Sequence, residues 1–289
     1  MSNPDVLPTD PSILVTGASG RLGGAVLDLL ASTVPVGRLH ALVRGADARA
    51  RLGARGIDAR IGDYDDAASL EAAFRGIDRL VFVSSPALDP AVRLPQHQAV
   101  LAAARAAGVG LVVYTSAFGA AHDPGHAGTE ALLEAEFGAP AGTEPSSIVL
   151  RNGFYTEPFV QRAVADARSG AILSAAGAGV LATASVRDLA EAAARVVVAP
   201  PASKRMWELR GRGWTYPELA REIGAELGRA VELREVSPED VGALGVLHAL
   251  AARGVLAAES DDLGALLGRE PRDVAAVVRE ELFRTPRVK

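Results

Sequence analysis

Short apolar runs alternate with stretches of helical period over the first half of the chain. The runs of strand length lie at 12–16, 38–43, 57–61, 78–84, 110–115 and 146–150, and the helical stretches lie at 21–31, 67–75, 94–107 and 127–137. Runs such as "RLVFVSS" and "LVVYTS" are almost continuously apolar, which indicates strands buried on both faces. The pattern predicts an α/β fold with a doubly wound parallel sheet, a Rossmann fold.

The rhythm changes after residue 151. "AILSAAG" and "RMWELRG" are expected as short strands, "TYPELAREIGAELG" as a helix with a threonine cap ahead of its proline, and the remainder as mostly helical. We therefore expect a main domain over 1–155 and a smaller C-terminal α/β substrate lobe over 156–289. The amphipathic stretch 185–200 is expected to return to the main domain.

Composition narrows the class of protein. The chain has 289 residues, 49% of them hydrophobic, so it can bury a full core. It has no cysteine, which excludes disulfides and thiolate chemistry. The formal charge of −5 comes without a basic stripe, so nucleic acid is not the expected partner. We find neither a signal peptide nor an uncharged run long enough to span a membrane. The expectation is a soluble, cytoplasmic protein that binds a small molecule; a homodimer stays open.

The strand-to-helix junction "VTGASGRLGG" carries the sharpest motif. A buried strand, a G-x-x-G-x-x-G turn and a helix form the arrangement in which backbone amides receive a pyrophosphate. A purely structural tight turn is the alternative. The residues expected to hold a dinucleotide here are Thr16, Gly17, Ser19, Gly20, Arg21, Leu22 and Gly23.

The end of the second strand indicates which dinucleotide is bound. NAD sites usually place a carboxylate there for the ribose 2′-hydroxyl, whereas this strand ends "HALVRG". Arg44 would pair with the 2′-phosphate of NADP, and Arg21 is a second candidate for the same phosphate. A solvated arginine at a strand end is the alternative reading.

Polar residues follow the third and fourth strands. Asp63 and Tyr64 are expected beside the adenine, with a turn-capping role for Asp63 as the alternative. Ser84, Ser85 and Pro86 are expected near the nicotinamide ribose, because ligands of parallel sheets lie over the carboxyl ends of the strands.

Taken together, the motifs resemble a known family. "VTGASGRLG", "ALVR", "GDYDD", "PQHQAVLAAARAAGV", "YTS", "HAGTEALLE", "VLRNGFYTE" and "GVLATASVRDLAEAAARV" occur in the order found in NmrA-like atypical short-chain dehydrogenases, which include bacterial NADPH-dependent quinone oxidoreductases and triphenylmethane reductases.

The resemblance implies further site residues. It implies that Thr115 and Ser116 contact the cofactor. It also implies that the nicotinamide and the acceptor lie beside Asn152, Gly153, Phe154 and Tyr155. From the residues alone, Phe154 and Tyr155 could equally well be core residues. His126, Thr129 and Glu130 match the family's His-x-x-Thr-Glu segment. Ala131 stands where some relatives carry lysine, which puts a proton relay through that lysine in doubt.

The absence of a tyrosine–lysine pair limits the reactions that we expect. No tyrosine is followed four residues later by lysine, so the usual alcohol proton relay is absent. Hydride transfer to a quinone leaves only a phenolate-like anion, which Asn152 could stabilise and which water, Tyr155 or His126 could protonate. A cationic dye needs no proton. The five histidines show no metal-ligand spacing.

A regulatory protein of the same family that binds NADP without turnover is the alternative function. The stretch 241–258 would then be a docking face rather than a core helix.

Overall fold

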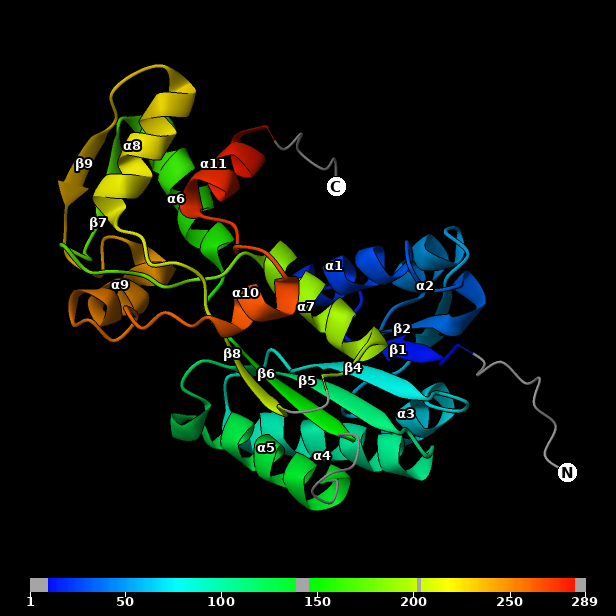
Figure 1. Ribbon diagram of the computed structural model, residues 1–289. Helices are drawn as coiled ribbons and strands as arrows, with labels where there is room; N and C mark the ends of the chain where they lie inside the picture. Colours follow the sequence, from blue (N-terminus) through cyan, green and yellow to red (C-terminus); the bar gives the residue numbers. More distant parts are fainter. Residues whose placement is uncertain (1–9, 139–145, 202–203, 284–289) are drawn as a thin grey trace, which may run out of the picture. The chain divides into compact units, whose positions relative to one another are not determined.

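The computed structural model describes residues 10–138, 146–201 and 204–283. Its main feature is a seven-stranded sheet in the order β3-β2-β1-β4-β5-β6-β8 (Figure 1). The strands are β1 (Ile13–Val15), β2 (Leu39–Val43), β3 (Asp58–Ile61), β4 (Arg79–Val83), β5 (Leu111–Ala117), β6 (Ser147–Asn152) and β8 (Met206–Leu209). The pairs from β3 through β5 are parallel. The strand order reverses at β1, where Ile13 pairs with Leu39 on one side and with Arg79 on the other. The predicted doubly wound sheet is confirmed.

Helices cover both faces of this sheet. One face carries α1 (Arg21–Leu30), α2 (Ala46–Gly53) and α7 (Val186–Val198), and the other carries α3 (Ala67–Ala73), α4 (Pro90–Ala106) and α5 (Pro124–Phe137) (Figure 1). Between the sheet and the second group of helices, Leu14, Leu80, Phe82 and Val112 are fully buried. Short 3₁₀ turns lie at Val36–Arg38 and Ala120–His122.

The chain divides into two compact units. One comprises Met1–Arg151 and Ala190–Trp207, and the other comprises Asn152–Leu189 and Glu208–Lys289. In the second unit, β7 (Ala171–Ser174) pairs in parallel with β9 (Glu232–Glu235). Its helices are α6 (Thr156–Ser169), α8 (Tyr216–Leu227), α9 (Gly245–Ala252), α10 (Asp262–Leu267) and α11 (Val274–Phe283), with a 3₁₀ turn at Gly242–Leu244.

The elements agree with the sequence where a pattern exists. The threonine cap is confirmed, because the Thr215 side chain accepts a hydrogen bond from the Glu218 amide at the start of α8. Helix α2 was not predicted, since it buries only Leu52 and therefore has no apolar stripe. Strand β8 was expected in the smaller lobe but is the seventh strand of the main sheet, because four residues do not specify their pairing partner.

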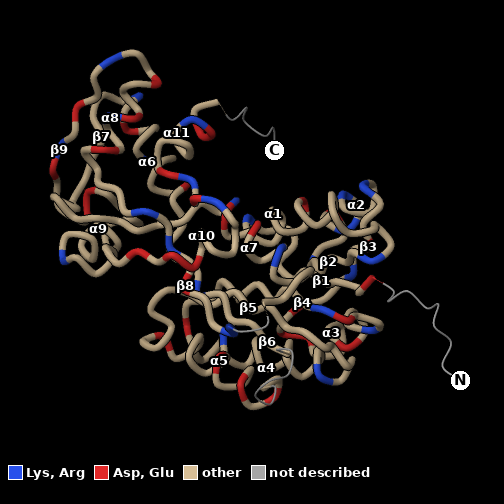
Figure 2. Tube along the Cα trace, viewed as in Figure 1, with Lys and Arg blue, Asp and Glu red and all other residues tan. Residues whose placement is uncertain are grey.

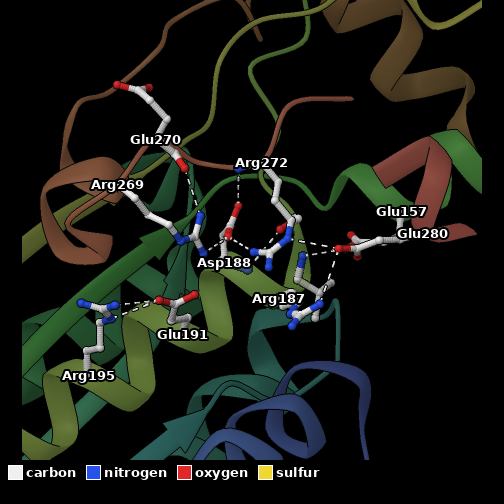
Figure 3. A network of polar contacts seen from close by, with 11 residues as sticks. Glu157, Arg187, Asp188, Glu191, Arg195, Arg269, Glu270, Arg272 and Glu280 are labelled. Atoms are coloured by element: carbon white, nitrogen blue, oxygen red, sulfur yellow. Dashed lines mark hydrogen bonds and ion pairs between the residues drawn. The ribbon is translucent and has the colours of Figure 1, made fainter. Parts of the chain in front are cut away.

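A buried carboxylate organises part of the second unit (Figure 3). Asp188 is completely buried at the start of α7. Its oxygens accept hydrogen bonds from the guanidinium of Arg269 (2.7 Å), the backbone amide of Arg272 (2.7 Å) and the Arg272 guanidinium. Arg272 also contacts Glu280 at 3.2 Å. The segment that joins α10 to α11 is thereby held to Asp188, within the second unit.

Within the described ranges, no helix is both long enough and apolar enough to cross a membrane.

Candidate functional site

The glycine turn after β1 has no room for side chains. Gly17 has φ +58°, a conformation that favours glycine, and a Cβ there would lie 3.2 Å from the Cβ of Val83. The amide of Gly20 donates to the Gly17 carbonyl at 2.8 Å. A Cβ on Gly23 would overlap that same carbonyl. The turn therefore needs glycine at Gly17 and Gly23, whereas a Cβ on Gly20 would lie 3.1 Å from the Gly17 carbonyl oxygen, a tight contact that a small shift can relieve.

Helix α1 begins without a side-chain cap. Its N-cap is Gly20, no acidic residue stands in its first turn, and no side chain among the described residues caps it. Leu22, the second residue of α1, is buried. The first amides of α1 are left without intrahelical acceptors, and the helix dipole adds positive potential. A phosphate group fits this end of the helix.

Two arginines flank the turn. Arg21, the first residue of α1, and Arg44, which follows β2, are both exposed. Neither makes an ion pair or hydrogen bond with the residues that the structure describes. Helix α2, which begins two residues after Arg44, carries Arg49 and Arg51. Figure 2 shows basic positions beside the α2 label. The carboxyl end of β2 can therefore accept a phosphate in addition to the one at α1.

The loop after β3 turns inward. The hydroxyl of Tyr64 lies 2.5 Å from Oγ1 of Thr16 and 2.7 Å from the Val83 carbonyl oxygen, and burial raises the pKa of Tyr64. Thr16 Oγ1 in turn accepts from the Val83 amide at 3.0 Å. Asp63 accepts from the Asp65 amide at 3.1 Å, which is a turn-capping contact. The side chains of Asp63 and Tyr64 thus both have hydrogen-bond partners within the protein.

The loop after β4 is also tied by hydrogen bonds. The amide of Ser84 donates to Thr115 Oγ1 at 3.1 Å, whereas Pro86 is exposed. The Ser85 hydroxyl donates to Gln96, whose Nε2 lies 2.9 Å from both carboxylate oxygens of Asp65. Gln96 and Asp65 were not predicted as site residues, because the link between the two loops depends on tertiary structure.

A buried group of polar side chains lies between β5, α4 and α5. The Nδ1 atom of His126 lies 2.7 Å from the hydroxyl of Tyr114, and the Nδ1 of His97 lies 2.8 Å from Thr129 Oγ1. Nε2 of His97 accepts from the Ser85 amide at 2.9 Å. Burial lowers the pKa of His97 to about 3 and also lowers the pKa of His126. His97 and Tyr114 were not predicted; a buried phenol in a strand, which needs a partner, was the available signal.

Ser116 at the end of β5 belongs to a second polar group. Its hydroxyl donates to Glu130 Oε1 at 2.7 Å, and Arg151 donates to the same carboxylate at 3.0 and 2.6 Å. Although burial raises the pKa of Glu130, the hydrogen bonds from Arg151 and Ser116 hold it below its ordinary value. Glu130 is therefore a hydrogen-bond acceptor at neutral pH.

The segment after β6 opens the second unit. Asn152 is 8% exposed, and its Oδ1 has no hydrogen-bond partner among the described residues. The amide of Gly153 donates to the Leu209 carbonyl at 2.8 Å, and a Cβ on Gly153 would lie 3.1 Å from that oxygen. Phe154 is 37% exposed, and Tyr155 is half-buried as the N-cap of α6.

No group of three or more metal-ligating side chains occurs among the residues that could be described.

Comparisons with known proteins give the family. Residues 17–139 match the model of an NAD(P)H-binding family. The chain is 36% identical over 232 residues to quinone oxidoreductase 2 of Escherichia coli, which covers 80% of each protein. It is 30% identical to an NmrA-like family domain-containing oxidoreductase of Aspergillus flavus, over 93% of this chain and 94% of that one. The crystal structure of the Citrobacter sp. triphenylmethane reductase complexed with NADP(H) superposes with a TM-score of 0.84 and 29% identity, over 93% of this chain and 99% of that one. The glycine turn on the first strand and these matches lead to one assignment: the chain belongs to the NmrA-like family of NAD(P)H-dependent oxidoreductases.

Proposed function

We propose that this protein transfers hydride from NADPH directly to a quinone or another planar conjugated acceptor, without a tyrosine–lysine proton relay. The relatives named as a quinone oxidoreductase and a triphenylmethane reductase support this acceptor class. The reduced nicotinamide supplies the hydride when it is bound, and the protein orients the two partners and excludes competing reactions. The cytoplasmic location expected from the sequence is part of the proposal.

The cofactor half of the proposal fits the residues present. The uncapped start of α1 and the glycine turn suit the pyrophosphate, and a side chain at Gly23 would displace the Gly17 carbonyl and so distort this turn. The exposed guanidinium groups of Arg44 and Arg21 suit the 2′-phosphate of NADP. The residues we assign to the cofactor are Thr16, Gly17, Ser19, Gly20, Arg21, Leu22, Gly23, Arg44, Asp63, Tyr64, Ser84, Ser85, Pro86, Thr115 and Ser116. For Tyr64 the assignment concerns backbone and ring contacts, because its hydroxyl is bonded internally, and Asp63 Oδ1 likewise caps its own turn.

The observation that carries the acceptor class is the missing Tyr-x-x-x-Lys pair. Reduction of an ordinary ketone yields a strongly basic alkoxide and needs a positioned acid. A quinone that accepts hydride becomes a phenolate-like anion with a pKa of roughly 10, which solvent can protonate. A cationic dye becomes neutral and needs no proton. We assign Asn152 as a hydrogen-bond donor to the developing oxyanion, Gly153 and Phe154 as acceptor contacts, and Tyr155 and His126 as candidates to assist the proton.

A panel of acceptors tests the proposal. Purified protein is given NADPH with a benzoquinone, a naphthoquinone, a triphenylmethane dye or a simple ketone, and the loss of reduced-nicotinamide absorbance is followed. We expect turnover with the quinones and the dye, and little with ketones. If the protein binds NADPH tightly but oxidises it with none of these acceptors, the catalytic proposal fails and a regulatory role takes its place.

A further inference from the structure

Strand β3 is the first strand in the order of the main sheet and so forms one of its two edges, beside α2 (Figure 2). The amide of Gly62, the residue after β3, donates to the Val43 carbonyl at 3.0 Å and therefore faces β2. Because successive residues of a strand direct their backbone groups to opposite sides, Ala59 and Ile61 direct theirs away from β2. On that side, no described residue makes a hydrogen bond to their N–H or C=O groups. This edge can therefore pair with a further strand.

The side chains on the α2 face of β3 are apolar. Ile57 and Ala59 are buried there and border an open depression of about 430 Å³. Ile61 lies on the same face, because side chains alternate along a strand, but it is 40% exposed. The helix side of the depression is formed by three small residues and one arginine, which are Ala46, Arg49, Ala50 and Gly53. The edge thus carries both an exposed isoleucine and an open hollow.

The side chains on the α3 face of β3 are charged. Asp58 Oδ2 accepts from Arg60 Nε at 3.0 Å and lies 2.8 Å from His40 Nδ1. The other oxygen, Oδ1, has no hydrogen-bond partner among the described residues, and the Asp58 side chain is 55% exposed. Arg60 Nη1 donates to the carbonyls of Ala73 and Arg75 at the end of α3, at 2.6 and 2.8 Å. One acid and one base, two residues apart, are therefore held in place at this edge.

These charges select one register for the pairing of β3 with a second copy of itself. Two-fold symmetry makes the strands antiparallel, and their free backbone groups meet only when the axis passes through a residue. An axis through Asp58 brings two carboxylates together, and an axis through Arg60 brings two guanidinium groups together; both arrangements are destabilising. An axis through Ala59 places Asp58 opposite Arg60 of the second copy, twice by symmetry, and Ile57 opposite Ile61. Axes beyond these residues leave most of β3 unpaired.

We propose that two copies of this protein join through β3, antiparallel about Ala59, into one continuous sheet. The N–H of Ala59 donates to the C=O of Ala59 in the second copy, and the N–H of Ile61 donates to the C=O of Ile57. The amide of Ile57 is not needed, since it already donates to the Leu52 carbonyl at 3.1 Å. Ile61 of each copy lies against the depression of the other, and the charged side chains pair on the α3 face. Because both copies use the same surface, the contact closes at a dimer.

Charge reversal tests the register. Sedimentation velocity over a concentration series should show the wild type moving from the mass of one chain, 29.8 kDa, towards twice that mass. Asp58→Arg and Arg60→Glu each place like charges opposite each other, so each should associate at least about tenfold more weakly. An equimolar mixture of the two variants should recover the association of the wild type to within about threefold. In the mixture, the introduced arginine of one variant lies opposite the introduced glutamate of the other.

Two further measurements do not depend on charge reversal. Ile61→Glu changes a partly exposed side chain, so the fold should be retained, but it places a carboxylate against the apolar depression, and association should be lost. In hydrogen exchange, the amides of Ala59 and Ile61 should exchange at least about tenfold more slowly in the dimer than in dilute protein. Arg105→Glu makes the same change in charge as Arg60→Glu at an exposed position of α4 and should associate like the wild type.

Thermal melting identifies any variant that fails to fold, and the exchange rates of the wild type remain decisive in that case. Three results would overturn the proposal. One is a wild type that keeps the mass of a single chain up to about 100 µM. Another is a dimer in which the amides of Ala59 and Ile61 exchange no more slowly. The third is a pair of folded charge variants that fail to associate when they are mixed.

Discussion

The backbone amide of Ser85 donates to Nε2 of His97, and burial keeps this histidine neutral. His248 is held in the same way by the Ala175 amide at 3.0 Å. Burial lowers the pKa of His97 to about 3 and that of His248 to about 4. Two histidines in separate parts of the fold therefore resist protonation.

Stability should decrease in mild acid. Below pH 6.5 the histidines of the unfolded chain bind protons, whereas His97 and His248 in the folded chain do not. The free energy of unfolding therefore falls as pH decreases towards 4. Between pH 7 and pH 5 the loss is about 2 kcal/mol for each buried histidine. Urea unfolding at the two pH values measures it. His97→Gln keeps an acceptor for Ser85 but does not titrate, so its pH dependence should be shallower, whereas His122→Gln at an exposed site should match the wild type. Identical slopes in all three proteins would count against this account.

Gly20→Asp should abolish tight binding of NADPH while the protein stays folded. Aspartate is a favoured N-cap, so the carboxylate would satisfy the free amides of α1 from within the chain. The same carboxylate occupies and repels the phosphate site, with an expected loss in affinity of about a hundredfold or more. Fluorescence titration and thermal melting measure the two effects. Gly37→Asp, at an open position ahead of β2, is the charge-matched control. A folded Gly20→Asp protein with normal affinity would remove the turn from the cofactor site.

Arg44→Ala should weaken NADPH and spare NADH. A charge-assisted contact with the 2′-phosphate contributes roughly 1.5 to 3 kcal/mol, or about ten- to a hundredfold in affinity. Arg105→Ala, an exposed arginine in the last turn of α4, makes the same change in charge at the amino edge of the sheet and should affect neither cofactor. Equal losses for both cofactors in Arg44→Ala would mean that this arginine is structural.

Asn152→Ala should impair quinone reduction severely, and Tyr155→Phe should not. The amide of Asn152 is assigned as an oxyanion donor, whose loss typically lowers kcat by about 10² to 10³. Tyr155→Phe keeps the ring and removes only a hydroxyl that solvent can replace. Steady-state kinetics with one quinone separates these contributions. A larger defect in Tyr155→Phe than in Asn152→Ala would reverse the two assignments.

Asp188→Asn should destabilise the second unit. The substitution leaves the Arg269 and Arg272 guanidinium groups without their buried carboxylate, and breaking such a pair costs about 3 to 5 kcal/mol. Glu191→Gln breaks the pair with Arg195, whose guanidinium is largely solvent-exposed, and should cost about 0.5 kcal/mol or less. Urea unfolding compares them, and equal stability of the two variants would contradict the role given to Asp188.

The sequence predicted features that local physics determines. The strand, glycine turn and helix at 13–30 follow from burial periodicity and from glycine stereochemistry, and the fold, the family and the NAD(P)H-binding class are confirmed. The roles assigned to individual site residues stay predictions. Contacts such as Tyr64 with Thr16, or Tyr114 with His126, join residues whose distance depends on how strands and helices pack. Strand β9 was missed for a different reason: its sequence, "ELRE", is polar and mostly exposed.

The unfinished first turn of α1 has a thermodynamic consequence for the whole protein. With the pyrophosphate bound there as proposed, amides that lack an acceptor in the free chain would gain one, and the dinucleotide would complete the helix as well as occupy a site. A ligand that binds only the folded state stabilises it by RT ln(1 + [L]/Kd), which is about 2.7 kcal/mol at a hundredfold excess over Kd. Saturation with cofactor should therefore raise the melting temperature of this protein and slow its proteolysis. Its abundance would then depend on the supply of the reductant that it consumes.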